Sequence, residues 1–171
     1  MRKMSYLLLN TGLRLEELLS LEWSRVNLLR RTILIRETKN GSPKTLPLNK
    51  IALEVLNQRS RVKNLKNDLV FISCRGKKVN RNFLRKCFYD VLEEVGIENL
   101  WLHDLRHTFA TRLAQAGVDL YKISKLLGHK DIRMTQRYAH HSLDSLRDGV
   151  EILESDYNLT TLGENKYSKG L

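Results

Sequence analysis

Six polar residues of the chain have side chains that together could transfer a phosphoryl group to a tyrosine: Arg14, Lys39, His103, Arg106, His129 and Tyr138. Two arginine guanidinium groups can clamp one phosphate through paired hydrogen bonds. Histidines and a lysine can move protons or donate to phosphate oxygens, and a tyrosine phenolate can attack. Their positive charge would stabilise a pentavalent phosphate. The sequence shows no paired carboxylates typical of a magnesium site, so the chemistry that it predicts needs no metal.

Taken one at a time, these residues also have ordinary structural explanations. Arg14 and Glu17 could form an exposed ion pair, which contributes only roughly a few tenths of a kcal/mol. Lys39 lies on a tight turn, where a lysine is usually solvated. His129 could cap the end of a helix, and Tyr138 could be a core residue with a hydrated hydroxyl. The functional interpretation therefore depends on the ordered set and not on any single member.

The composition indicates a basic globular protein. The chain has 171 residues, enough for one domain with a sizeable core, and 42% of them are hydrophobic. Lysine and arginine number 30 against 19 acidic residues, and a formal charge of +11 favours a polyanionic partner, usually nucleic acid. Cys74 and Cys87 match no metal motif, which indicates free thiols in a reducing compartment. Because no apolar run is long enough to span a bilayer, we expect a cytoplasmic, DNA-associated, non-membrane protein.

The elements that must position the six residues are mainly helices, with one small antiparallel sheet. Periodicity and capping signals predict helices over about 4–9, 14–21, 50–61, 81–95, 103–116, 120–127 and 142–154, and a short helix that begins at Asp131 and carries Tyr138. In the helix over 50–61, Ile51, Val55 and Leu56 are expected on one apolar side. Alternation and the Asn40-Gly41 turn predict a hairpin with strands at 32–35 and 44–48, and a third strand at 69–72. We therefore expect an α+β domain over residues 1–154, followed by a polar tail over 155–171.

The helix predicted from about residue 103 carries three of the candidates. His103, Arg106 and His107 are spaced i, i+3 and i+4, so they share one helical face. Arg106 lies at the edge of the apolar stripe of this helix. An arginine so close to a core needs an anion, which is either a phosphate or a carboxylate. The structural alternative is an ion pair with Asp104 or with a distant glutamate.

Four stretches of the chain resemble the motifs of the tyrosine recombinase, or phage integrase, family. TGLRLEELLSL resembles the box around the first catalytic arginine, and LHDLRHTFATRLAQAG resembles the H-x-x-R box. LLGHKDIRMTQRYAH resembles the final box with its tyrosine, and ETKNGSPKTLPL resembles the family's β-hairpin with its lysine. The resemblance covers about residues 1–150 and implies that the six residues are catalytic, within the family's DNA breaking-rejoining fold. Lys44 lies on the same hairpin and is the alternative to Lys39.

The resemblance implies that the chain cleaves and rejoins duplex DNA through a 3′-phosphotyrosine, without a metal or nucleotide cofactor. Tyr138 attacks the scissile phosphate, a 5′-hydroxyl leaves, and the 5′-hydroxyl of another strand reverses the step. Arg14 and Arg106 clamp the non-bridging oxygens. Lys39 is the expected acid toward the leaving oxygen.

Further roles are implied around these groups. His103 is expected to be the base toward the tyrosine, and His129 is expected to donate to the phosphate. The groups expected to orient the catalytic side chains are Glu17, Asp104 and His107. The residues expected to contact DNA are Arg14, Lys39, Arg106, Arg81 and Arg133.

The resemblance also implies protein partners on the DNA. The predicted helix from about Ser142 to Glu154 resembles the family's segment that docks onto a neighbouring protomer, so a tetrameric synapse is expected. Packing against its own domain is the alternative for this helix. Because the chain begins almost at the first box, we expect the family's N-terminal DNA-binding domain to be absent, and an isolated chain that is monomeric and binds DNA weakly.

Three other functions are compatible with these residues. A type IB topoisomerase shares the tyrosine and its clamp but would not join strands between two duplexes. A DNA-binding regulator that has lost catalysis would form no covalent adduct. A metal hydrolase could use His103, His107, His129 and His140, although the acidic residue of an H-E-x-x-H motif is missing. The sequence leaves open the DNA site, the host, and the choice among integration, excision, resolution and transposition.

Overall fold

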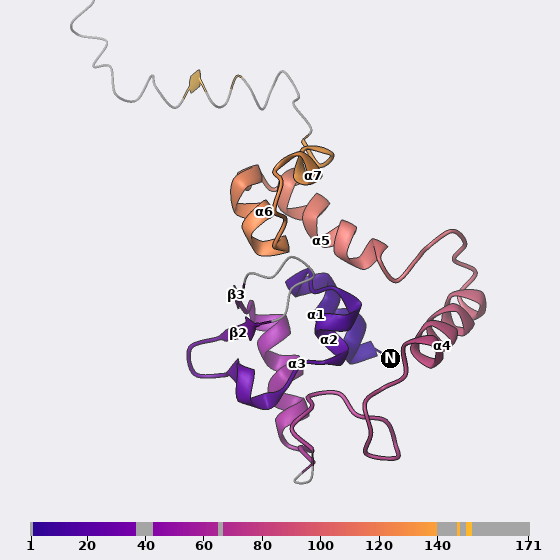
Figure 1. The fold of residues 1–171 in the computed structure, drawn as a ribbon. Helices are drawn as coiled ribbons and strands as arrows, with labels where there is room; N and C mark the ends of the chain where they lie inside the picture. The colour runs from indigo at the N-terminus through magenta and orange to yellow at the C-terminus, as the bar shows by residue number, and fades with distance from the viewer. Residues whose placement is uncertain (1, 37–42, 65–66, 140–146, 148–149, 152–171) are drawn as a thin grey trace, which may run out of the picture. The chain divides into compact units, whose positions relative to one another are not determined.

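The computed structural model describes residues 2–36, 43–64, 67–139, 147, 150 and 151 (Figure 1). The chain divides into two compact units, Met1–Ala139 and His140–Leu171. Lys39 and its predicted turn, most of the predicted helix over 142–154, and the predicted tail lie outside the described residues. Every site residue discussed below belongs to the first unit.

The first unit is mainly helical with one small sheet, as predicted. Its elements are α1 (Arg2–Thr11), α2 (Leu15–Leu19), the 3-10 helix η1 (Trp23–Arg25), β1 (Val26–Asn27), β2 (Thr32–Ile35), β3 (Lys44–Pro47), α3 (Lys50–Ser60), α4 (Arg81–Glu94), α5 (Asp104–Gln115), α6 (Leu120–Leu127) and α7 (Arg133–Gln136). Within the described residues, no helix is both long and apolar enough to cross a membrane.

The sheet is antiparallel and has the order β1-β2-β3. Ile33 pairs with Leu46 and Ile35 pairs with Lys44. Ile33 and Ile35 are buried, whereas Thr32 and Leu34 are only partly buried, which follows from the two-residue period of a strand. The two predicted strands of the hairpin are confirmed, and β3 brings Lys44 to the start of the returning strand.

The predicted strand at 69–72 is wrong, because this run forms only isolated bridges, at Leu69 with Glu22 and at Ile72 with Lys78. The guanidinium of Arg59 donates to the carbonyl oxygen of Val70 at 3.1 and 3.3 Å. The run is apolar because it enters the core, where Val70 is 1% exposed. Burial alone therefore produced a strand-like pattern.

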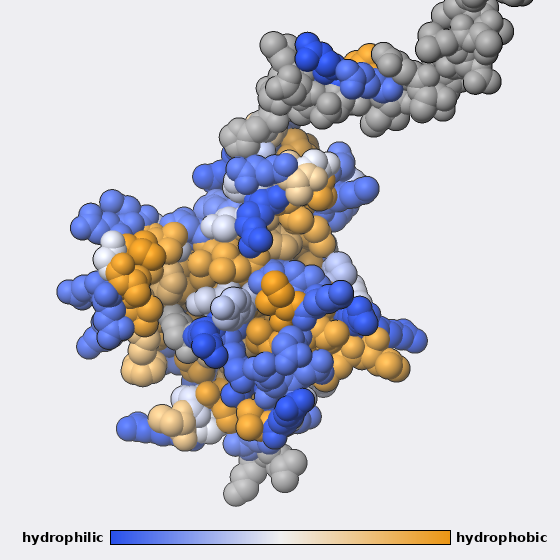
Figure 2. Space-filling model, turned by 180° about the vertical axis from the view of Figure 1, so that it is seen from behind, coloured by the Kyte–Doolittle hydropathy of each residue, from blue (hydrophilic) through white to orange (hydrophobic). Residues whose placement is uncertain are grey.

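The main core lies where α1 packs against α3 and α5. It contains Leu7, Leu18, Ile33 and Leu56, and all four side chains are fully buried. On α3, Val55 and Leu56 are buried, as expected for its apolar side, whereas Ile51, which was expected on the same side, is 50% exposed. Figure 2 shows hydrophilic side chains spread over one face of the molecule with apolar groups between them, as expected for a strongly basic chain.

A second, smaller apolar cluster joins α5, α6 and the segment after α7, which lie side by side (Figure 1). It consists of Ala110, Ile123, Leu127 and Tyr138. The ring of the candidate nucleophile is therefore also a packing group. Both interpretations of this tyrosine, as a core residue and as a reactive one, are compatible with its position.

Helix α6 has the predicted start and end. The side chain of Asp119 accepts a hydrogen bond from the backbone N–H of Lys122 at 3.1 Å, which caps the first turn. Gly128 follows the helix with φ +67°, the left-handed conformation that glycine adopts without strain. A Cβ at this position would lie 3.0 Å from Cδ of Lys44, so the glycine also allows that side chain to approach.

The prediction that a helix carries Tyr138 is wrong, because α7 ends at Gln136. Asp131 does accept from the backbone N–H of Arg133, at 2.9 Å, as predicted for a helix start. The N–H of Tyr138 then donates to the carbonyl of Thr135 at 2.9 Å, a bond between residues three apart. Such bonds tighten the backbone and end a helix, so the tyrosine lies on a turn.

Gly12 lies after α1 at a point where a side chain would be strained and would displace a neighbour. Its φ is +62°, and a Cβ there would lie 2.5 Å from Cδ1 of Phe109. We expect Gly12→Ala to lower the free energy of unfolding by about 3 kcal/mol, since backbone strain adds to the clash. Gly117→Ala is the matched control, because Gly117 has φ +75° but nothing within 4 Å of its Cβ position. Urea unfolding of both variants measures the difference, and equal losses would show that the Phe109 contact is not the cause.

Candidate active site

Five of the six predicted catalytic residues lie in the described part of the chain, and Lys39 does not. Arg14 immediately precedes α2 with an extended backbone. Its backbone N–H donates to Oε2 of Glu17 and its Nη1 donates to Oε1, both at 2.9 Å. The predicted pair of Arg14 and Glu17 is therefore present, but the carboxylate is only 5% exposed and is not part of the surface.

Arg106 is buried, with 4% of its surface exposed, and is held by two backbone carbonyls. Nη1 donates to the oxygen of Gly12 at 2.6 Å, and Nη2 donates to the oxygen of Leu127 at 2.7 Å. These bonds join α5 to the end of α1 and to the end of α6. Burial, reinforced by the charge of Arg14, lowers the pKa of Arg106 to about 10, so the group stays protonated at neutral pH.

Lys44 enters the site from β3, although sequence patterns alone did not separate it from Lys39. Its Nζ lies 3.2 Å from Oε2 of Glu17 and 3.2 Å from the carbonyl oxygen of Leu127, and its side chain is 9% exposed. Burial lowers the pKa of Lys44 to about 8, against the opposing effect of Glu17. Glu17 is therefore shared between a lysine and an arginine from different elements.

Tyr138 is 6% exposed, and its hydroxyl is hydrogen-bonded to Nδ1 of His107. The ring of His107 meets that of His103 edge to face, with centroids 4.7 Å apart. Burial raises the pKa of the Tyr138 hydroxyl and lowers the pKa of each histidine. The sequence suggested only an orienting role for His107, and its i+4 spacing from His103 was the available signal.

His129 follows Gly128 at the end of α6 and is half-buried. Its backbone N–H donates to the carbonyl of Ser124 at 3.0 Å, and its Nδ1 lies 2.9 Å from Oγ1 of Thr135. Burial, together with the positive charge of Arg106 and other basic groups, lowers the pKa of His129 to about 4. The imidazole is therefore neutral near pH 7. Sequence analysis missed Thr135, which lies three residues before the tyrosine.

Three other predicted residues lie further from this cluster. Asp104, the first residue of α5, accepts a hydrogen bond from the backbone N–H of Trp101 at 2.7 Å and so fastens the segment before the helix. Arg81 lies 3.6 Å from Glu16, and Arg133 lies 2.6 Å from Asp131, in both cases with a side chain more than half exposed. Their expected contacts with DNA stay predictions.

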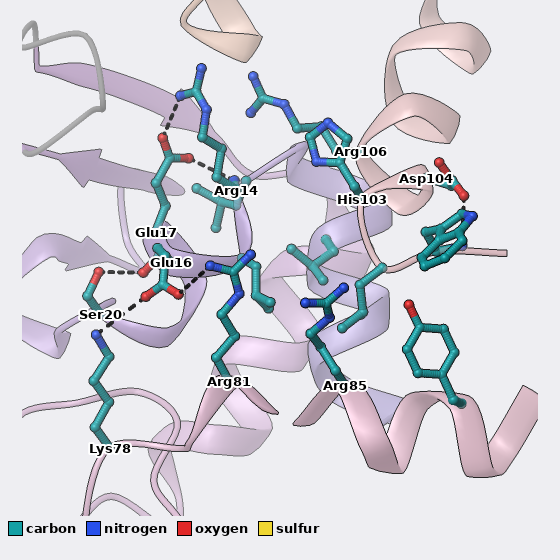
Figure 3. A pocket seen from close by; sticks show the side chains of 16 residues that line it. Arg14, Glu16, Glu17, Ser20, Lys78, Arg81, Arg85, His103, Asp104 and Arg106 are labelled. Atoms are coloured by element: carbon teal, nitrogen blue, oxygen red, sulfur yellow. Dashed lines mark hydrogen bonds and ion pairs between the residues drawn. The ribbon is translucent and has the colours of Figure 1, made fainter. Parts of the chain in front are cut away.

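A pocket of about 970 Å³ opens beside the arginines (Figure 3). Its basic lining comes from α2, α5 and the segment around the start of α4: Arg14, Lys78, Arg81, Arg85, His103 and Arg106. Figure 3 shows Arg14, His103 and Arg106 near one another at one end, with Lys78, Arg81 and Arg85 approaching from the other. Among the described residues, no three histidine, cysteine or acidic side chains gather as a metal site.

The pair of Lys44 and Glu17 predicts a pH dependence of stability. Burial tends to raise the pKa of Glu17, but Lys44 and the bonds from Arg14 hold it below its usual value. A lowered carboxyl pKa stabilises the fold above the unfolded pKa, and this contribution is lost as the pH falls through the folded pKa. In Lys44→Met the Glu17 carboxylate keeps its two bonds from Arg14 but loses the ammonium group, so its pKa rises and the variant loses about 2 kcal/mol of stability at neutral pH.

This loss is expected to shrink toward acid, because Glu17 without the ammonium of Lys44 takes up a proton at a higher pH than in the wild type. Urea unfolding of the wild type and Lys44→Met at about pH 5 and about pH 7.5 measures it. Lys86→Met is the control, since Lys86 is an exposed lysine on α4. A deficit of the same size at both pH values would contradict the role given to the Glu17 carboxylate.

Comparison with known proteins gives the family. The profile of the phage integrase family matches residues 1–144. The tyrosine recombinase XerC of Roseiflexus sp. (strain RS-1) is 34% identical over 147 residues, which are 81% of this chain and 47% of that protein. The chain therefore spans about half the length of the curated relatives that it matches.

Solved structures have the same fold. The XerH site-specific recombinase bound to its difH substrate superposes with a TM-score of 0.72 at 28% identity, over 90% of this chain and 46% of that one. The Tn1549 transposon integrase, in complex with a circular intermediate DNA, has a TM-score of 0.75 at 23% identity, over 88% of this chain and 58% of that one. With a matching profile, a similar relative and this shared architecture, the chain belongs to the phage integrase family and has the fold of a tyrosine recombinase catalytic domain.

Proposed function

We propose that this chain is the catalytic domain of a site-specific recombinase that cleaves and rejoins duplex DNA through a 3′-phosphotyrosine at Tyr138. The observation that carries the proposal is the hydrogen bond between the hydroxyl of Tyr138 and Nδ1 of His107. It lies in the same unit as the buried Arg106. A nucleophile, a proton acceptor and fixed positive charges are the components that phosphoryl transfer to tyrosine requires.

Arg106 and Arg14 are suited to clamp the non-bridging oxygens of a phosphate. The two bonds of Arg106 to carbonyls fix the plane of its guanidinium, which has five N–H donors. Backbone carbonyls carry no net charge, so they hold the group without neutralising it. Preorganised positive charge of this kind stabilises a transition state without reorganisation at the moment of reaction.

In this proposal His107 is the group that accepts the proton of the Tyr138 hydroxyl. His103 was the expected base, but His107 bonds to the hydroxyl, and His103 packs edge-on against His107. Because its pKa is lowered, His107 is neutral near pH 7 and has a free electron pair on one nitrogen for the proton. His103 then lies next to the acceptor and beside Arg106, at the edge of the phosphate site.

Lys39 stays the proposed acid toward the leaving 5′-oxygen, from outside the described residues. Lys44, the alternative, is already engaged by the Glu17 carboxylate and the Leu127 carbonyl. We assign Lys44 to holding these groups, with the orienting role of Glu17 retained. His129 is proposed to donate a hydrogen bond to the phosphate.

Duplex DNA is the proposed partner. The solved XerH and Tn1549 integrase structures that resemble this chain are complexes with DNA. The excess of basic residues gives the chain a formal charge of +11, and basic side chains line the pocket beside Arg14 and Arg106. Arg81 and Arg133 are proposed to contact backbone phosphates, and residues 142–154 to dock onto a neighbouring protomer.

The test is a trapping experiment with nicked duplexes of randomised sequence, incubated with the protein and a chelator. A denaturation-resistant adduct whose nucleotide-bearing peptide contains Tyr138 is the expected result. An adduct on another residue, or one that requires a metal, would contradict the proposal. Retained DNA binding with no adduct would favour a regulator, and relaxation of supercoiled DNA without joining between duplexes would favour a topoisomerase.

A further inference from the structure

Thr135 has an unusually enclosed polar side chain within the site. It lies on α7 with 0% of its surface exposed. Its Oγ1 is 2.9 Å from Nδ1 of His129. Its carbonyl accepts the N–H of Tyr138 at 2.9 Å, so one residue contacts both the candidate phosphate ligand and the turn that carries the nucleophile.

We propose that Thr135 is a positioning residue that selects the tautomer of His129, so that the imidazole carries its hydrogen on Nε2 and can donate it to a phosphate oxygen. The tautomer itself is a property of the free protein. Only its consequence for the reaction rests on the proposed function.

The direction of the hydrogen bond follows from burial. A hydroxyl has one hydrogen and two lone pairs, so Thr135 can either donate to Nδ1 or accept from it. Within the described residues, Nδ1 of His129 is the one hydrogen-bond partner recorded for Oγ1. If Nδ1 carried the hydrogen, the buried hydroxyl hydrogen would have no acceptor in the part of the chain that the structure describes, at a cost of about 1–3 kcal/mol. The hydroxyl therefore donates, and Nδ1 carries the lone pair.

The charge state of His129 completes the argument. Burial lowers its pKa, and the nearby Arg106, Arg14, Lys44 and His107 lower it further. A neutral imidazole holds one hydrogen, and with Nδ1 as acceptor that hydrogen is on Nε2. The other tautomer would present a lone pair to an anion and repel it. In histidines that bind a ligand, the hydrogen bond made by one ring nitrogen commonly determines whether the other nitrogen carries the hydrogen, and the same rule is applied to His129 here.

Nitrogen-15 NMR of the imidazole rings in the free protein near neutral pH tests the tautomer. His129→Gln identifies the signals, because they disappear in that variant. The wild type and Thr135→Ser are expected to show the Nε2–H form, since both side chains have a hydroxyl. Thr135→Val has nearly the same shape but no donor, and it is expected to show a mixture that includes the Nδ1–H form.

Two outcomes would overturn the proposal. One is a wild-type His129 that carries its hydrogen on Nδ1, and this result does not depend on the folding of any variant. The other is a folded Thr135→Val whose tautomer matches the wild type. Neither measurement involves DNA cleavage, so failure of the recombinase function would leave them unaffected.

Single-turnover cleavage of a nicked duplex tests the consequence for the reaction. Thr135→Val is expected to slow cleavage about 10- to 100-fold, the usual effect of removing a group that orients a ligand, and Thr135→Ser is expected to restore most of the rate. A valine variant with a mixed tautomer and the wild-type rate would refute this consequence. A wild type that makes no adduct would refute the proposed function and not the tautomer.

Discussion

Tyr138→Phe is expected to remain folded and to bind DNA, but to form no covalent adduct. The substitution removes the one oxygen that can become the phosphotyrosine and keeps the ring, which packs with Ala110, Ile123 and Leu127. The lost hydrogen bond to His107 lowers the free energy of unfolding by about 1 kcal/mol. DNA binding without any adduct is the result expected when the nucleophilic oxygen alone is removed.

The experiment compares wild type, Tyr138→Phe and Tyr121→Phe on the same nicked duplex, with adducts resolved under denaturing conditions and binding followed by anisotropy. Tyr121 is the control because it is 61% exposed on α6 and its ring is covered by the ammonium of Lys125 at 4.8 Å. Its variant is expected to form adducts as the wild type does. An adduct with Tyr138→Phe would assign the chemistry to another nucleophile.

Much of the fold follows from short-range signals in the sequence. Asp119 marks the start of α6 through its capping side chain, and Gly128 marks the end through its left-handed backbone, so both ends can be predicted from the local sequence. The alternation in β2 likewise reports its buried face. The prediction of a strand at 69–72 was wrong because an apolar extended segment in a core has the same sequence pattern as a strand, and in the structure this run forms only isolated bridges.

The sequence motifs proposed the members of the candidate site, but they did not predict the hydrogen bonds that connect them. Tyr138 and His129 were found through the motif, yet the turn that positions the tyrosine depends on bonds three residues apart. Thr135 has no distinctive sequence signal, since its importance comes from burial against a histidine on another element. The position of Lys44 in the site also has no local sequence signal, because its partner Glu17 lies 27 residues earlier in the chain.

The partners of Arg106 differ from those that its sequence position predicted. An arginine beside a core was expected to meet a phosphate or a carboxylate, and within the described residues its bonds are to carbonyls, one of them at the C-terminal end of α6. The last carbonyls of a helix carry partial negative charge, so they stabilise a guanidinium as an anion would. A carboxylate would have cancelled its charge, whereas the carbonyls leave that charge for a phosphate.

Arg106→Gln is accordingly expected to reduce both stability and catalysis. The carbonyls of Gly12 and Leu127 lose a charged donor in a buried site, which lowers the free energy of unfolding by about 3 kcal/mol. Loss of one preorganised donor to the phosphate slows cleavage by about 10²- to 10³-fold. Arg106→Lys keeps the charge but not the planar fork, so it cannot serve both carbonyls and is expected to be only partly active.

The two effects are separable because they have different measurements. Urea unfolding gives the stability, and single-turnover cleavage well below the unfolding midpoint gives the rate for folded protein only. Arg112→Gln is the matched control, since it changes the same residue type on the exposed face of α5. If folded Arg106→Gln cleaved at the rate of this control, Arg106 would be a structural tie between α1, α5 and α6 and not part of the clamp. A rate loss that persists in the folded fraction instead assigns its remaining N–H donors to the phosphate.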